Sequence, residues 1–259
     1  MSRVITAAAL VTGLALTAGC SQPPLIKGAE TPAATADPTT PTPGPAASPF
    51  GGESAHQIWT EAQAAARAAT TVHVVAKMVD GTDRMSVDLN LAHGGDASGS
   101  ITLNGRRMTL ERHDGIAYLK AGLGFWQAFD AGQAPAQKFA NHWIRWTKDD
   151  RSLKDIDDLL DMDYWVKNTT VGMDKKTRQN LRVIAGKTIG GEETVGLADH
   201  AAGADTAATG TMYISTSTGL PVTLRLGTDG SQYLKYRDWN AAVDFEAPLT
   251  SFDLDPYLA

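Results

Sequence analysis

Apolar and polar residues alternate with a period of two along much of the chain between Val72 and Leu119. The clearest run has apolar side chains at every second position, at Met85, Val87, Leu89 and Leu91. This alternation is typical of strands that are buried on one face only. Turn dipeptides follow at Asp80-Gly81, Gly94-Gly95, Asn104-Gly105 and Asp114-Gly115. We therefore predict an antiparallel meander whose apolar face is covered by other parts of the chain.

Helices on either side of this meander are available to cover it. Ser54 and Gln57 form a capping-box pattern, which predicts a helix running to Ala69. The segment 122–172 is dense in aromatic residues, and we expect helices and loops there, with a second helix start at Ser152. Strand patterns return over residues 182–189, 194–197, 211–215, 221–227 and 232–239. Because strands and helices do not alternate as in a parallel sheet, the predicted fold class is α+β.

The charge of the chain restricts its partners. There are 23 Lys and Arg residues against 29 Asp and Glu residues, a formal net charge of −6. An acidic chain repels polyanions, which argues against nucleic acid and against anionic lipid headgroups as partners. The single cysteine, Cys20, cannot form a disulfide within the chain, so the fold depends on its own core.

The first twenty residues have the pattern of a signal peptide. Arg3 precedes an apolar run from Val4 to Leu16, which is too short to span a bilayer, and small residues lead to Cys20. The sequence Leu16-Thr17-Ala18-Gly19-Cys20 resembles the lipobox of bacterial lipoproteins. We predict that residues 1–19 are removed and that Cys20 carries acyl chains such as palmitate. The alternative is an ordinary secretory signal with a chance cysteine.

Residues 20–49 are predicted to form a tether. This segment is rich in Ala, Thr and Pro, and it holds eight of the 12 prolines of the chain. The composition changes at Phe50, which places the folded domain at residues 50–259. Acylation of Cys20 would hold that domain at the outer face of the cytoplasmic membrane through two acyl chains, without a spanning helix.

Several short motifs are similar to those of a known family. They are Asp114-Gly115-Ile116-Ala117-Tyr118-Leu119, Trp126, the run from Ala185 to Gly191, Thr218-Gly219-Leu220-Pro221-Val222 and Asp238-Trp239-Asn240. This layout resembles the LppX/LprG-type actinobacterial lipoproteins of the LolA/LolB-like superfamily. The resemblance implies a LolA-like half-open antiparallel β-barrel with helices covering the concave face. It also implies a cavity for the acyl chains of lipids or glycolipids, which this family carries without catalysis.

The candidate ligand-binding residues are the inward apolar positions of the predicted strands. These are Val74, Met78, Val87, Leu89, Leu110, Leu119 and Leu224. Trp126 and Phe129 are added as a hydrophobic mouth, with a buried lid as the alternative for both. The inward set can equally be plain core, and the deciding feature is whether space remains between the sheet and the helices.

No catalytic or metal-binding pattern stands out. Gly186-Lys187-Thr188 lacks the first glycine of a phosphate-binding loop, and the histidines show no metal-ligand spacing. The acidic run from Asp149 to Asp163 is predicted to be a solvated helix face. We expect no enzyme activity, no cofactor and no metal. The alternative to a lipid carrier is an envelope interaction or sensor domain with a filled barrel that binds a protein partner, and an envelope transporter is a further candidate partner.

Overall fold

The computed structural model describes residues 50, 52–129, 133–147, 153–168, 181–199, 210–226 and 230–254. The predicted signal peptide, Cys20 and the tether lie outside these residues. Among the helices described, none is both long and apolar enough to cross a membrane.

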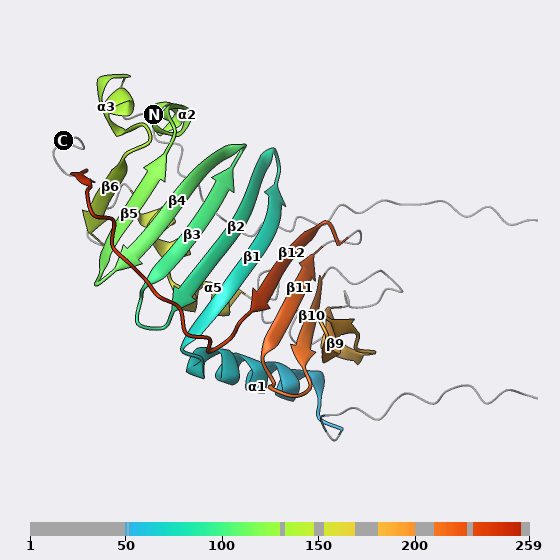
Figure 1. The fold of residues 1–259 in the computed structure, drawn as a ribbon. Helices are drawn as coiled ribbons and strands as arrows, with labels where there is room; N and C mark the ends of the chain where they lie inside the picture. The colour runs from blue at the N-terminus through green and yellow to red at the C-terminus, as the bar shows by residue number, and fades with distance from the viewer. Residues whose placement is uncertain are drawn as a thin grey trace, which may run out of the picture.

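One large open sheet dominates the fold (Figure 1). Its strands are β1 (Thr71–Asp80), β2 (Asp83–Ala92), β3 (Ala97–Leu103), β4 (Arg106–His113), β5 (Ile116–Ala121), β6 (Trp143–Thr147), β7 (Leu181–Ile184), β9 (Glu192–Asp199), β10 (Gly210–Ser215), β11 (Pro221–Leu226), β12 (Gln232–Arg237) and β13 (Phe252–Asp253). Their order across the sheet is β13-β6-β5-β4-β3-β2-β1-β12-β11-β10-β9-β7, and β8 (Thr188–Ile189) pairs with β9 outside this path. The β13–β6 pair is parallel and the other pairs are antiparallel.

The predicted meander is confirmed. Strands β1 to β5 are joined by hairpins in sequence order, and the turn at Asn104-Gly105 has positive φ at both residues, as a tight two-residue hairpin requires. Along β1 the side chains alternate between buried and more exposed positions. The two-residue period therefore puts one face of the sheet in the core.

In the described part of the chain, five helices accompany the sheet. They are α1 (Ala55–Ala68), α2 (Leu123–Ala128), α3 (Gln133–Phe139), α4 (Lys154–Leu159) and α5 (Met162–Asn168). Helix α1 begins with the predicted capping box, in which Ser54 Oγ accepts from the backbone N–H of Gln57. Helices α4 and α5 lie behind the sheet in Figure 1, and α1 crosses the end at which β1 begins. Their apolar side chains and the concave face of the sheet form one continuous core.

Two local predictions need correction. The aromatic segment contains a strand, β6, as well as helices, because Ile144 and Trp146 alternate with outward residues and pair with β5. The strand expected over 182–189 is divided into β7 and β8. Between them the hydroxyl of Thr194 donates to the carbonyl of Lys187 and accepts from its N–H, in addition to a backbone hydrogen bond from the N–H of Thr194 to the same carbonyl.

The second helix start also differs from the prediction. Helix α4 has Leu153 at its N-cap, with no side-chain hydrogen bond there. Ser152, which the sequence pattern suggested as the cap, lies outside the described residues.

Candidate functional site

The concave face of the sheet carries four rows of side chains, each crossing neighbouring strands in register. The first row is Val72, Leu91, Ala97, Arg112, Ala117 and Trp146. The second row is Tyr236, Val74, Leu89, Gly99, Leu110, Leu119 and Ile144. The third row is Leu224, Leu234, Ala76, Val87, Ile101, Met108 and Ala121. The fourth, which we call the rim row, is Leu226, Gln232, Met78, Met85, Leu103 and Arg106.

Burial changes sharply at the rim row. Apart from Gly99, which has no side chain, every residue of the first three rows is buried, and all of these except Arg112 belong to the single apolar core. In the rim row Met78, Met85, Leu103 and Leu226 are only partly buried against that core. The apolar face therefore reaches solvent at the end where the β1–β2 and β3–β4 hairpins turn.

The structure brings the predicted sheet residues onto this one face. Val74, Leu89, Leu110 and Leu119 lie in the second row, Val87 and Leu224 in the third, and Met78 in the rim row. Their shared orientation follows from the antiparallel register, in which directly paired residues point to the same side of the sheet.

The aromatic helices cover one side of this face. Trp126 of α2 is 0% exposed, and its ring lies 5.2 Å from Phe125 and 5.1 Å from Phe139 of α3. Phe129 packs edge-to-face on Trp126 at 6.0 Å and stays half-buried. Of the two interpretations left open for Trp126, the structure favours the buried lid.

Two buried indole groups have no hydrogen-bond partner among the residues that the structure describes. Within the described residues, Trp126 Nε1 and Trp146 Nε1 have no acceptor. Such donors are rare in folded proteins, because an unpaired buried N–H costs about 1–3 kcal/mol. Both belong to the apolar core. Trp126 lies on helix α2, which covers the concave face, and Trp146 lies on strand β6, which forms part of it.

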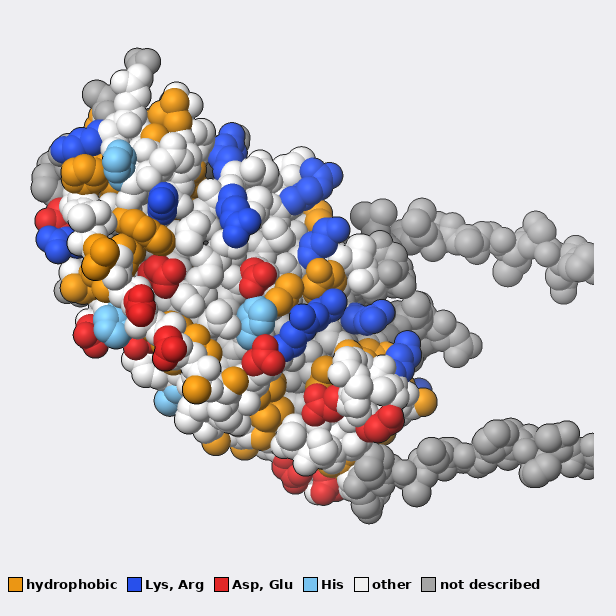
Figure 2. Space-filling view, in the orientation of Figure 1, with side chains coloured by type: hydrophobic (Ala, Val, Ile, Leu, Met, Phe, Trp, Pro, Cys, Tyr) orange, Lys and Arg blue, Asp and Glu red, His pale blue; other side chains and the backbone are white. Residues whose placement is uncertain are grey.

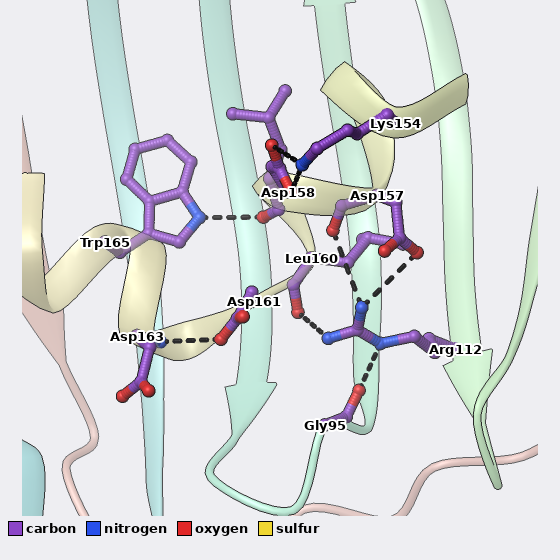
Figure 3. Close-up of polar contacts among 10 residues, drawn as sticks. Gly95, Arg112, Lys154, Asp157, Asp158, Leu160, Asp161, Asp163 and Trp165 are labelled. Atoms are coloured by element: carbon purple, nitrogen blue, oxygen red, sulfur yellow. Dashed lines mark hydrogen bonds and ion pairs between the residues drawn. The ribbon is translucent and has the colours of Figure 1, made fainter. Parts of the chain in front are cut away.

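A buried guanidinium group fastens the α4–α5 cover to the sheet (Figure 3). Arg112 Nη2 donates to the carbonyl of Leu160 at 2.6 Å, and Nη1 approaches Asp157 Oδ1 at 3.4 Å. Its Nε donates to the carbonyl of Gly95 in the β2–β3 turn. Asp157 is therefore buried, which corrects the prediction that the whole acidic run is solvated. A charged residue at an inward strand position was the sequence signal for this contact.

A polar hollow lies beside Arg112. Its volume is about 300 Å³, and it is lined by His93, Gly94, Gly95, Arg112, Gly115, Asp161 and Asp163. The carboxylate of Asp161 accepts from the backbone N–H of Asp163 at 2.8 Å. Because polar groups line it, this hollow does not suit an alkyl chain. No group of three or more potential metal ligands occurs in the described part of the chain.

The convex face is partly closed near β4. Glu111 points to this face and is half-buried, and desolvation raises the pKa of its carboxyl to about 7. Its strand partner Tyr118 is buried on the same face. The segment that joins β12 to β13 crosses this side of the sheet in Figure 1.

These features define a class of α+β proteins built on one large, mostly antiparallel open sheet with helices over its concave face. No protein-family model and no curated protein matches the sequence. Among solved structures, LprF from Mycobacterium bovis matches with a TM-score of 0.50 at 16% identity, over 75% of this chain and 96% of that one. The chain thus shares the LprF fold, as the LppX/LprG-type motifs predicted.

Two further structures are similar at lower scores. The lipoprotein LppX of Mycobacterium tuberculosis gives a TM-score of 0.43 at 15% identity, over 74% of this chain and 98% of that one. MucB in its complex with MucA from Pseudomonas aeruginosa gives 0.35 at 15% identity, over 74% of this chain and 59% of that one.

Proposed function

We propose that this protein is a cell-envelope lipoprotein that binds and carries the acyl chains of a lipid or glycolipid in a hydrophobic cavity, without catalysis. The observation that carries the proposal is the concave face, where three buried apolar rows end in a half-buried rim row. An acyl chain entering at Met78 and Met85 would leave water for this face and gain about 0.8 kcal/mol per buried methylene. A ten-carbon stretch then retains several kcal/mol after the costs of association.

The properties of the lining suit such a ligand. Methionine side chains are flexible and polarisable, so Met78, Met85 and Met108 can adapt to alkyl chains of different shape. The indole N–H groups of Trp126 and Trp146, which have no acceptor among the described residues, would each donate a hydrogen bond to a ligand oxygen. An ester or amide carbonyl at the head of an acyl chain supplies such an oxygen.

The test is a binding measurement on delipidated protein with a fluorescent fatty-acid probe. The double variant Met78→Gln/Met85→Gln places two amides at the rim, and we expect it to weaken probe binding at least about fivefold, since each desolvated amide costs about 1 kcal/mol or more. The matched control Thr82→Gln/Ser86→Gln changes exposed positions of the same hairpin. Equal affinities of the two variants, or no probe uptake by the wild type, would overturn the proposal.

The anchor belongs to the same proposal. We propose that Cys20 is acylated and that the tether of residues 20–49 holds the domain at the outer face of the cytoplasmic membrane. Mass spectrometry of the mature amino terminus should find a modified Cys20, and Cys20→Ala should release the protein from the membrane fraction. An unmodified Cys20 in the mature protein would contradict the anchor while leaving acyl binding intact.

A second candidate function has its own supporting observation. Trp59, Trp126, Trp146 and Trp165 are all fully or almost fully buried in the core, as expected for an interior filled by the protein's own side chains. Such a domain would act as an envelope interaction or sensor module with a protein partner. Native mass spectrometry of protein from its own cells separates the two, because a carrier retains lipid and a filled module does not.

A further inference from the structure

The charges on the convex face are segregated, although the whole chain is acidic. Figure 2 shows Lys and Arg gathered over the hairpin-tip end and the neighbouring β11–β12 region, while Asp and Glu lie mainly over the other parts of this face. At the tips the cations are Lys77, Arg84, Arg106 and Arg107, which we call the cationic tip. We propose that the cationic tip docks on the surface of an anionic lipid bilayer.

The strand register places Lys77, Arg84 and Arg107 on the convex face and Arg106 on the opposite face at the same end of the sheet. Lys77 pairs with Ser86 and Arg107 pairs with Thr102, and these pairs lie in one row across β1 to β4. Arg84 pairs with Val79, and Arg106 ends the rim row beside Leu103. On the other side of Lys77 the same row continues through Tyr233 to Arg225.

These cations are free to meet an external anion. All four side chains of the cationic tip are exposed, and none forms an ion pair with another described residue. The carboxylates at this end are Asp80 and Asp83 in the β1–β2 turn, and Asp83 accepts a hydrogen bond from the side chain of Asn104. The positive charge therefore exceeds the negative charge at this end of an otherwise acidic protein.

Apolar side chains lie among the cations. Val79 is 38% exposed, and Met78, Met85 and Leu103 of the rim row are half-buried. A bilayer interface offers phosphate to Lys and Arg and a hydrocarbon boundary to such apolar groups. A purely polyanionic partner would satisfy the cations and leave the methionines and Val79 without contacts. The combination therefore favours a membrane surface.

This inference goes beyond acyl binding, and it corrects the exclusion of anionic headgroups that net charge suggested. Net charge averages over the surface, whereas a bilayer touches only one end of the molecule within about a Debye length of 10 Å. Docking at the rim would also place the opening of the apolar face against the membrane.

The test uses the full chain with Cys20→Ala, which cannot be acylated, and vesicle co-sedimentation. Vesicles contain either phosphatidylcholine alone or a phosphatidylcholine–phosphatidylglycerol mixture. We expect tighter binding to the anionic vesicles, with the preference lost at about 0.5 M salt. Binding contributed by residues 1–20 is common to every variant and does not affect the comparison among them.

The decisive variant is Lys77→Gln/Arg84→Gln/Arg107→Gln, whose three positions are exposed on the convex face and lie outside the rim row. Because each cation near an anionic surface strengthens binding about fivefold, it should lose at least about tenfold in affinity for anionic vesicles. The matched control Arg67→Gln/Lys154→Gln/Lys187→Gln removes the same charge from exposed positions away from the tips and should stay within about twofold of the parent. Equal losses in the two triple variants would overturn the proposal.

Acyl-probe affinity in vesicle-free buffer separates this inference from the proposed function. The tip variant should bind the probe as the parent does, because its substitutions are at exposed positions. Normal probe binding without a preference for anionic vesicles would refute the docking proposal and leave the carrier proposal intact. A preference for anionic vesicles without probe binding would refute the carrier proposal and leave the docking proposal intact.

Discussion

Arg112 links the α4–α5 cover to the sheet through a buried polar site. Its guanidinium joins the β2–β3 turn, Asp157 and the carbonyl of Leu160 in a buried site. Arg112→Met leaves the Asp157 carboxylate buried without its partner, so we expect a loss of about 3–5 kcal/mol in the free energy of unfolding. Urea denaturation measures this loss. Lys154→Met, which removes an exposed pair with Asp158, should leave the unfolding midpoint nearly unchanged, and similar losses for both variants would contradict the assignment.

Glu111 should make stability depend on pH. Burial raises the pKa of its carboxyl from 4.5 to about 7 in the folded protein, so the folded state binds the proton more tightly than the unfolded state. Stability from this group is complete below pH 4.5 and is lost as the pH rises through the window to about 7. Glu111→Gln should therefore match the wild type at low pH and exceed it at pH 8. Thermal unfolding across this range tests the prediction, with Glu61→Gln on the exposed face of α1 as control, and a constant difference between Glu111→Gln and the wild type would exclude it.

At the level of elements, most of the sheet could be predicted from the alternation of apolar and polar residues, because each long strand shows this two-residue period within its own sequence. The capping box likewise fixed the start of α1. Strand β6 was missed because five residues among many aromatics give a weak local pattern, and its pairing with β5 bridges the segment that contains α2 and α3. The candidate lining could be predicted as one face of the meander. The cationic tip could have been found from the turns at Gly81 and Gly105, since hairpin register places Arg84 and Arg107 at the same end.

Strand β3 depends on a glycine that the alternation pattern did not explain. Gly99 lies in the second row with φ of +142°, and a Cβ there would overlap the carbonyl oxygen of Asp88 on β2. Gly99→Ala should therefore destabilise the protein by about 1–3 kcal/mol through backbone strain and displacement of β2. Gly94→Ala, where a Cβ meets open space, should stay within about 0.5 kcal/mol of the wild type. Thermal melting of the two variants makes the comparison, and an unchanged Gly99→Ala protein would mean that β2 and β3 separate without cost.

At the scale of the whole molecule, the two ends of the sheet differ in charge and in cover. The end near α4 and α5 holds Asp155, Asp158, Asp161 and Asp163, while the opposite end holds the cationic tip and the open rim row. An anionic surface would therefore turn the rim toward itself. Helix α1 lies at the first-row end of the sheet (Figure 1). If the rim end faces the membrane, the tether that precedes α1 must span the length of a ten-residue strand, roughly 33 Å, to reach the membrane. About thirty residues of predicted tether reach from roughly 30 Å as a coil to roughly 90 Å when extended, which allows this orientation.

The coincidence of rim and cationic tip predicts how cargo would move between protein and membrane. If the opening touches the bilayer, an acyl chain passes directly and the transfer rate rises with vesicle concentration; release through water would give a rate independent of it. We expect stopped-flow transfer of a fluorescent fatty acid from the protein to be faster with anionic than with zwitterionic vesicles. Lys77→Gln/Arg84→Gln/Arg107→Gln should slow transfer at least about tenfold while leaving equilibrium probe affinity unchanged. Met78→Gln/Met85→Gln should instead lower the equilibrium affinity for the probe, because these substitutions affect the burial of its acyl chain. A transfer rate that does not depend on vesicle concentration or charge would mean that the fatty acid is released into water, and would contradict transfer by direct contact at the rim.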